Sequence, residues 1–351
     1  MKALVTGGCG FLGSHVAEAF LREGFEVVAY DNLTKHELER TGYATEAARA
    51  HLRERLEGLG VTVQVADVRD ASALLDAASG CDILAHTAAQ PAMTIGWEQP
   101  GLDFETNLAG TRNVLEAARR HGLPVAACST VHVYGPGLND DLHETPTRCA
   151  RRPPMVREDE PLLRTGANGR LTPLHASKAG AEHYVRVYAD QYGVRAASFR
   201  LTGLYGPRQF GGEDHGWVAN FAIRALLGRP LTIFGDGRQT RDVLYADDAA
   251  AAFVAWQRQP QAGAFNVCGG PERELSLLEC IDLLATLLGT RPQVAFEPAR
   301  PGDLRWFCGD SARARAAFGW EPRVLPAEGV RRLLGWAAEH RALFAGSEPG
   351  A

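Results

Sequence analysis

The chain has 351 residues, and 37 lysines and arginines stand against 42 aspartates and glutamates, which gives a formal net charge of −5. This acidic balance argues against a protein whose main task is binding nucleic acid, because contacts to phosphates need a basic excess. Hydrophobic residues make up 45% and charged residues 23%, which is ordinary for a globular chain and excludes extended disorder.

Short apolar runs alternate with amphipathic stretches through the first half of the chain. Buried strands are expected at 2–6, 25–30, 61–66, 83–87 and 125–128. Helical spacing of apolar residues predicts helices at 15–23 and 104–121. Because apolar strands alternate with helices, we expect a parallel sheet covered on both faces and connected by right-handed crossovers. The fold class is therefore predicted as doubly wound α/β, the Rossmann type.

The second half of the chain is less regular. Residues 135–171 are rich in Pro, Arg, Asp and Glu, and we interpret them as a long surface excursion and a candidate cover for the active site. A strand is expected at 196–200, and helices are expected at 177–192, 275–288, 312–318 and 329–340. We expect one domain over 1–205, to which 240–268 return. A smaller mixed α/β substrate domain, mostly C-terminal, is expected over 206–239 and 269–345.

The cysteines and the apolar runs indicate the compartment. The seven cysteines form no Cys-x-x-Cys pair and no close cluster with histidine, so neither a metal site nor a disulfide framework is expected. Reduced thiols are typical of the cytoplasm, which is where we place the protein. The apolar run before Gly7 is too short for a signal peptide. The sequence also has no run of about 20 apolar residues, so no membrane span is expected.

The first predicted strand ends in a glycine-rich loop. The segment 8–13 reads GCGFLG, which fits the pattern Gly-x-Gly-x-x-Gly between a strand and a helix. The glycines let the backbone approach a pyrophosphate, and the helix N-terminus offers N–H groups and a partial positive charge. An ordinary glycine-rich turn is the alternative. The loop predicts an NAD site in the first domain, with contacts from Gly7, Gly10, Phe11, Leu12 and Gly13.

Acidic residues follow the next two strands. Asp31 ends the second strand about 20 residues beyond the loop, where a carboxylate accepts hydrogen bonds from the ribose hydroxyls. The same charge repels a 2′-phosphate, so NAD is favoured over NADP. A turn or helix cap at Asp31 and Asn32 is the alternative. Asp67 and Val68, after the third strand, are candidates to border the adenine, and a simple turn is the alternative there.

Six segments carry a family resemblance: TGGCGFLG (6–13), HTAAQ (86–90), NLAGT (107–111), VYG (133–135), YGPR (205–208) and RDV (241–243). They resemble the extended short-chain dehydrogenases/reductases that modify nucleotide sugars, the NAD-dependent epimerase/dehydratase family. Within it, QPAMT (90–94), HGWV (215–218) and GDGRQTRDVL (235–244) look most like CDP-sugar 2-epimerases. The resemblance implies retained NAD and oxidation of a sugar carbinol to a transient ketone. It also adds Ala88 and Gln90 to the NAD site.

One position departs from the family pattern. The resemblance implies a catalytic Tyr four residues before a Lys, together with a Ser or Thr on a neighbouring strand. Lys178 matches the Lys, which also binds the nicotinamide ribose, and Thr130 matches the Ser or Thr. The Tyr position holds Leu174, and leucine cannot carry a proton.

Three explanations of Leu174 stay open. The first is that another group replaces the Tyr. The second is that the chain is a natural or engineered variant with impaired catalysis. The third is that the chain catalyses a different reaction, in which hydride transfer needs no strong base. His132 stands where related 4,6-dehydratases place a catalytic Glu, and His175 adjoins the missing Tyr. Histidine exchanges protons near neutral pH, and a desolvated Lys178 is a further candidate base. A structural histidine is the alternative for both His132 and His175.

The substrate side rests mainly on arginines. The resemblance assigns the diphosphate to Arg241 and Arg300, and Arg208 is a further candidate, because guanidinium offers two parallel donors to phosphate oxygens. Thr94 and Trp217 are candidates to line the sugar pocket. The helices expected at 104–121 and 177–192 resemble those that pair in family homodimers, which predicts a homodimer.

Three hypotheses follow from these observations. The first is an NAD-dependent epimerase of a nucleotide-linked sugar. The second is a nucleotide-sugar dehydratase or decarboxylase that uses His132 as its acid or base. The third is a non-catalytic NAD-binding protein, which Leu174 motivates and which the presence of Thr130 and Lys178 argues against.

Overall fold

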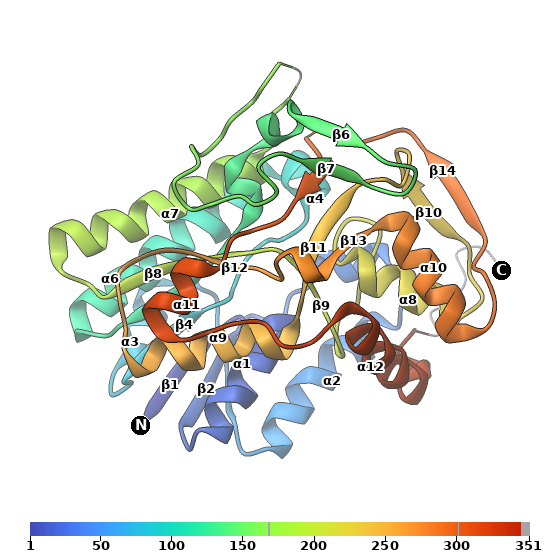
Figure 1. Ribbon diagram of the computed structural model, residues 1–351. Coiled ribbons are helices and arrows are strands. Elements are labelled where there is room, and N and C mark those ends of the chain that lie inside the picture. The colour runs from blue at the N-terminus through green and yellow to red at the C-terminus, as the bar shows by residue number, and fades with distance from the viewer. Residues whose placement is uncertain (168, 301, 345–351) are drawn as a thin grey trace.

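A seven-stranded parallel sheet forms the centre of the computed structural model, which describes residues 1–167, 169–300 and 302–344 (Figure 1). Its strand order is β3-β2-β1-β4-β5-β8-β12. The strands are β1 (Lys2–Thr6), β2 (Glu26–Asp31), β3 (Thr62–Val65), β4 (Ile83–His86), β5 (Val125–Thr130), β8 (Ala196–Leu201) and β12 (Gly263–Val267). The predicted doubly wound α/β class is confirmed, because helices cover both faces of this sheet.

The two faces of the sheet bury separate apolar clusters. On one face lie α1 (Phe11–Arg22), α9 (Ala246–Arg258) and α11 (Ala312–Phe318). On the other face lie α3 (Ala71–Ala78), α6 (Gly110–His121) and α7 (Pro173–Tyr192). In Figure 1 the two sets of helices lie on opposite sides of the strands. This sandwich fixes the carboxyl ends of the strands along one edge.

The C-terminal part builds a third apolar cluster beside that edge. It contains α8 (Trp217–Leu226), β10 (Leu231–Phe234), β11 (Thr240–Tyr245), α10 (Leu277–Leu288), β14 (Val294–Glu297) and α12 (Pro326–Glu339). Strand β11 pairs with β9 (Gly203–Tyr205), β13 (Glu274–Ser276) and β15 (Trp306–Phe307). Strand β12, between these segments, returns to the central sheet and pairs with β8.

The remaining described elements are short. They are α2 (Thr45–Gly58), α4 (Met93–Glu98), α5 (Pro100–Asp103), β6 (Leu142–Glu144), β7 (Cys149–Arg151), a π-helical turn (Phe104–Ala109) and 3₁₀ turns at His36–Arg40, Val131–Tyr134, Pro136–Asn139, Pro271–Arg273 and Arg341–Phe344. The helix expected at 104–121 is therefore two elements, a π-helical turn followed by α6. Such turns are frequent at functional sites.

Capping residues set the starts of two helices. The helix expected from 177 begins at Pro173, because Thr172 caps it and His175 completes a capping box. The helix expected from 275 begins at Leu277, because Ser276 and Glu279 form a capping box there. The sequence prediction missed α8 and α9 altogether. Residue 345, the end of the expected substrate domain, lies outside the described residues.

Two searches of the described residues concern membrane helices and metal sites. Within the described ranges, no helix is both long enough and apolar enough to cross a membrane. Likewise, no group of three or more His, Cys, Asp or Glu side chains in the described part of the chain is placed to hold a metal ion.

Candidate active site

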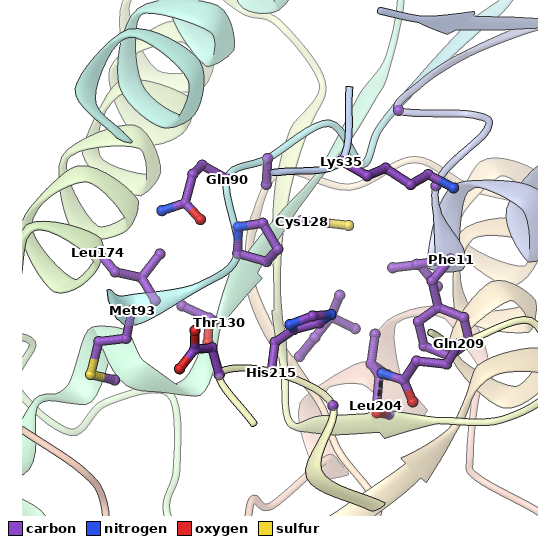
Figure 2. A pocket seen from close by; sticks show the side chains of 18 of the residues that line it. Phe11, Lys35, Gln90, Met93, Cys128, Thr130, Leu174, Leu204, Gln209 and His215 are labelled. Carbon is purple, nitrogen blue, oxygen red and sulfur yellow. Dashed lines mark hydrogen bonds between the residues drawn. The ribbon is translucent and has the colours of Figure 1, made fainter. Parts of the chain in front are cut away.

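A cavity of about 570 Å³ opens where the central sheet meets the C-terminal part of the chain. Its walls include residues at or just beyond the carboxyl ends of β1, β2, β4 and β5, where open α/β sheets bind ligands. Figure 2 shows Leu174 and Thr130 towards one end of this cavity, and Phe11 and Lys35 towards the other.

Most predicted site residues line this cavity. They are Gly7, Gly10, Phe11, Leu12, Asp31, Asn32, Val68, Ala88, Gln90, Thr94, Thr130, His132, Lys178, Arg208, Trp217, Arg241 and Arg300. Gly13, Asp67 and His175 lie behind its walls. The described residues of the excursion at 135–171 contribute nothing to these walls, so its expected role as a cover for the active site is wrong.

The glycine loop makes a tight cradle between β1 and α1. Gly7 adopts φ +67°, and a Cβ atom there would lie 2.6 Å from the backbone nitrogen of Ala88. A Cβ atom on Gly13 would lie 1.9 Å from the carbonyl oxygen of Gly7, so only glycine lets α1 pack against the loop. The first turn of α1 holds no acidic residue, which leaves its positive end open to an anion.

Asp31 ends β2 at the rim of this cradle. Its carboxylate accepts hydrogen bonds from the backbone N–H of Cys9 at 2.9 Å and of Leu33 at 2.7 Å. Asp67 is turned to other partners, because Arg69 and Asn32 both donate to its carboxylate. The hydrogen bond from the Arg69 guanidinium lowers the pKa of Asp67 to about 2. Asp31 therefore lies in the cavity wall with its carboxylate held by two backbone N–H groups, whereas the Asp67 carboxylate is engaged by neighbouring side chains.

A buried polar network orders the chain after β4. The Asn107 amide accepts from the Gln90 backbone N–H at 2.9 Å and donates to the Gln90 carbonyl at 3.0 Å. Asp103, fully buried, accepts from the amides of Gln90 and Asn107 and from the Ser177 hydroxyl. Asn107 thus braces the backbone beside the site, and the network ties α7 to the segment that follows β4.

Thr130, Lys178 and Leu174 meet at one wall of the cavity. The Lys178 ammonium lies 3.3 Å from the Cys128 carbonyl, and burial lowers the pKa of Lys178. Leu174 lies one turn before Lys178 on α7 and is 5% exposed, with its side chain in the cavity wall. No acid or base therefore stands where the family pattern requires a Tyr.

Two histidines lie close to this wall. The rings of His132 and His175 are perpendicular, with their centroids 5.6 Å apart. Burial lowers the pKa of His132 to about 3 and that of His175 to about 4, so both rings are neutral at pH 7. Only His132 reaches the cavity.

The three arginines predicted to bind phosphate have different partners in the structure. Arg241 donates to Asp303 at 3.0 Å and to the Leu304 carbonyl. Arg300 lies over the Phe234 ring at 3.6 Å and pairs with Asp214 at 3.5 Å.

Arg208 pairs with Glu18 at 3.0 Å and has φ +70°. This contact holds it against α1, on the cofactor side of the cavity, where Glu18 competes with any phosphate.

Several lining residues escaped sequence reasoning. They are Lys35, Met93, Cys128, Leu204, Gln209, Phe210, Asp214, His215, Asn220 and Phe221. Most lie in loops and at helix starts that carry no chemical pattern of their own. The signal for Met93 and His215 was present, because they fall within the segments 90–94 and 215–218 that resemble the family. Thr94 and Trp217 come from the starts of α4 and α8, on the substrate side.

Known proteins resemble this chain in sequence and in fold. The family model described as "NAD dependent epimerase/dehydratase family" matches residues 3–268. The CDP-paratose 2-epimerase of Salmonella typhi is 33% identical over 96% of this chain and 99% of its own length. The UDP-glucose 4-epimerase of Thermotoga maritima, solved with UDP-glucose, superposes with TM-score 0.81 at 27% identity over 97% of this chain and 100% of its own.

A further solved relative contains the cofactor. The UDP-glucuronic acid 4-epimerase of Bacillus cereus, in complex with UDP-glucuronic acid and NAD, gives TM-score 0.80 at 26% identity, and the match covers 97% of this chain and 100% of that one. The glycine cradle, the open end of α1 and Asp31 fit the NAD on which this family depends. The fold, the glycine site and these similarities agree that the chain belongs to the NAD-dependent epimerase/dehydratase family.

Proposed function

We propose that the chain is an NAD-dependent epimerase of a nucleotide-linked sugar, nearest in activity to CDP-tyvelose (CDP-paratose) 2-epimerase. Bound NAD supplies the hydride acceptor and donor for oxidation of a sugar carbinol and reduction of the resulting ketone from its other face. The observation that carries the proposal is the placement of Thr130 and Lys178 in the wall of one cavity with the glycine cradle. The similarity to a CDP-paratose 2-epimerase supports the choice of reaction.

The substrate would lie across the cavity from the cofactor. Residues 1–205 and 240–268 would hold NAD, and 206–239 and 269–344 would hold the nucleotide sugar. Arg241 and Arg300 would bind the diphosphate, since both line the cavity and both are already oriented by carboxylates. Thr94 and Trp217 would line the sugar end.

Leu174 requires a different proton acceptor from the family Tyr. Lys178 and His132 both line the cavity and can both take up a proton. The Thr130 hydroxyl, which also accepts from the His132 backbone N–H at 3.3 Å, would hold the substrate oxygen. Burial favours the neutral amine of Lys178, which is the form that takes a proton.

Two other functions compete with the epimerase. A dehydratase or decarboxylase would use His132 as acid or base at the position of the dehydratase Glu. A non-catalytic NAD-binding protein would explain Leu174 directly. Thr130 and Lys178 favour the epimerase over the latter, because a protein that only binds NAD has little use for both.

One experiment separates these functions. The NAD-loaded protein is incubated with CDP-, UDP- and GDP-sugars in deuterated water, and the products are followed by NMR. Epimerisation yields an epimer without solvent deuterium at the oxidised carbon, because the hydride returns from the cofactor. Deuterium beside a ketone would instead identify the dehydratase, and no product from any sugar would leave only NAD binding.

The assembly and compartment are also proposed. The outer face of α7 exposes Tyr184, Val187 and Tyr192, of which 44%, 45% and 56% is accessible. Apolar side chains of this size at helical spacing support the predicted homodimer. All seven cysteines are free thiols, which supports a cytoplasmic protein.

A further inference from the structure

The capping box of α7 determines the tautomer of His175. The Thr172 hydroxyl lies 2.6 Å from the His175 Nδ1, and the Thr172 backbone N–H donates to the same Nδ1 at 3.2 Å. Because a backbone N–H can only donate, Nδ1 carries a lone pair, and the hydroxyl then donates to it as well. A neutral imidazole has one N–H group, which must then be on Nε2. This Nε2 is buried and has no hydrogen-bond partner among the described residues. Glu or Gln usually takes this place in a capping box, and neither would present a ring N–H at this point.

His132 is the aromatic neighbour of His175, and one of its ring nitrogens also lacks a hydrogen-bond partner among the described residues. Its Nδ1 is buried without a partner in the described part of the chain, while the residue itself lines the cavity. A proton on this Nδ1 would create a second unpartnered N–H group beside the first. A lone pair on this Nδ1 avoids that cost, and it lies within reach of the His175 N–H dipole, because the two ring centroids are only 5.6 Å apart. Electrostatics therefore favours a His132 ring protonated on Nε2, the nitrogen available to a ligand.

The charged neighbours of His132 oppose its protonation. Arg241, on β11, and His175, on α7, both lower its pKa, in addition to the larger effect of burial. The Arg241 guanidinium is itself paired with Asp303 at 3.0 Å. The N-terminus of α7 adds its own partial positive charge. A neutral imidazole in such a place donates a hydrogen bond and is a poor base.

We propose that His132 donates a hydrogen bond from Nε2 to the substrate oxygen that becomes the ketone, and that His175 is a positioning residue that sets the His132 tautomer. This assignment rests on the proposed function. As the carbinol is oxidised, its hydride leaves to NAD and its hydroxyl proton passes to the Lys178 amine, whose uncharged form burial favours. His132 and Thr130 stabilise the developing carbonyl, and reduction reverses each transfer. Leu174 then needs no acid–base role.

The first test needs no substrate. NAD-loaded protein with ¹⁵N-labelled histidine is examined by NMR, and the two rings are assigned with His132→Gln and His175→Gln. We expect both rings to be neutral at pH 6 and protonated on Nε2. A His132 ring that is protonated on Nδ1, or doubly protonated at pH 6, would overturn the proposal. Because turnover is not measured, a failure of the proposed function leaves this result interpretable.

The second test compares His175→Gln with His175→Glu. Both side chains keep the capping box, so melting temperature and NAD affinity should match between them. The carboxylate of the Glu variant should raise the pKa at which His132 titrates by about one unit or more relative to the Gln variant. If His175 is only a cap, both variants will show the same His132 titration, and the positioning role is excluded.

The third test separates a donor from a base at His132. Glutamine keeps an N–H donor and cannot take a proton, whereas leucine does neither. We expect His132→Gln to turn over nucleotide sugar about tenfold faster than His132→Leu. Equal loss in both variants would identify His132 as the base and overturn the proposal. If the wild-type protein turns over no sugar, the proposed function fails, and the NMR experiments still decide the tautomer.

Discussion

Arg241 and Asp303 form an ion pair at the substrate side of the cavity, with 3.0 Å between the guanidinium Nη2 and a carboxylate oxygen. They lie 62 positions apart in the sequence, and both line the cavity. Asp303 orients the guanidinium and also competes with any phosphate for it. The Arg241 side chain is 11% exposed and also donates to the Thr240 carbonyl, so it has little freedom, and this would pre-organise its remaining donors for the diphosphate of the proposed substrate.

Replacement of Arg241 with Lys tests this clamp. Lysine keeps the positive charge and loses the planar fork, so we expect the KM for nucleotide sugar to rise about tenfold or more, with NAD affinity unchanged. Steady-state kinetics and isothermal titration with NAD measure the two effects. Arg238→Lys is the matched control, because Arg238 pairs with Glu144 away from the cavity. Equal KM values in both variants would remove Arg241 from the diphosphate site.

The sequence was sufficient for six of the seven strands of the central sheet and for the glycine loop, and it predicted no strand at the position of β12. Apolar strands between helices specify a parallel sheet, and a glycine loop between β1 and α1 specifies where a dinucleotide binds. The prediction missed α9, because its alanine-rich run at Ala246–Arg258 shows no clear apolar stripe. It placed the start of α7 too late, because His175 fills a capping position usually held by Glu or Gln.

The substrate side was less accessible to sequence reasoning. Contacts such as Arg241 to Asp303, and Arg300 to Asp214 and Phe234, join loops whose relative positions depend on tertiary packing. The pairing of His132 with His175 likewise depends on how α7 packs against the turn after β5. Residue types alone do not reveal such neighbours.

Gly13 offers a test of the cofactor cradle. A Cβ atom at this position would overlap the Gly7 carbonyl at 1.9 Å, so Gly13→Ala must displace the loop or α1. We expect the purified variant to lose its NAD and to lose about 2 kcal/mol of stability. Gly58→Ala is the control, since nothing lies within 4 Å of a Cβ atom there. Retention of NAD by Gly13→Ala would contradict the cradle.

The low pKa of Asp67 predicts that part of the free energy of unfolding is lost in acid. Its pKa is about 2 in the folded protein, below the ordinary value of 3.8, chiefly because Arg69 donates to it. The stabilisation is therefore complete above about pH 4 and is lost as the pH falls towards 2. Since the pair is partly exposed, solvent screening reduces it to about 1 kcal/mol or less.

Urea unfolding of wild type and Asp67→Asn measures this effect. The wild type should be the more stable protein at pH 6, and the difference should be much smaller near pH 2. High salt at pH 6 should also reduce it, because the ion pair is screened. A stability difference that is the same at both pH values would assign it to packing and exclude the ion pair as its source.

The outer face of α7 predicts the oligomeric state. Val187 is 45% exposed beside Tyr184, and a charge there would be buried in a dimer. We expect Val187→Glu to convert a dimer to a monomer in sedimentation velocity, with the melting temperature lowered only by the loss of the partner. Leu59→Glu places the same charge on an equally exposed leucine at the end of α2 and should remain dimeric. A monomeric wild type would refute the homodimer.

Restoration of the family Tyr at Leu174 probes how the site works. Leu174 is 5% exposed in the cavity wall, and its helix neighbour His175 is packed against His132. Tyrosine is larger than the space that leucine fills, so it would intrude on the cavity or displace these rings. We expect Leu174→Tyr to lower turnover of nucleotide sugar by about tenfold, despite the added hydroxyl.

Leu174→Phe separates the size of the ring from its hydroxyl. Phenylalanine and tyrosine should impair turnover equally if Lys178 takes the proton, because the hydroxyl then has no partner in the reaction. Both variants should keep NAD, since Leu174 faces the substrate end of the cavity and not the glycine loop. A Leu174→Tyr enzyme that is faster than both wild type and Leu174→Phe would show that the site still accommodates the family mechanism. Lys178 would then act beside a tyrosine, as in the family pattern, and the assignment of the proton to Lys178 alone would be wrong.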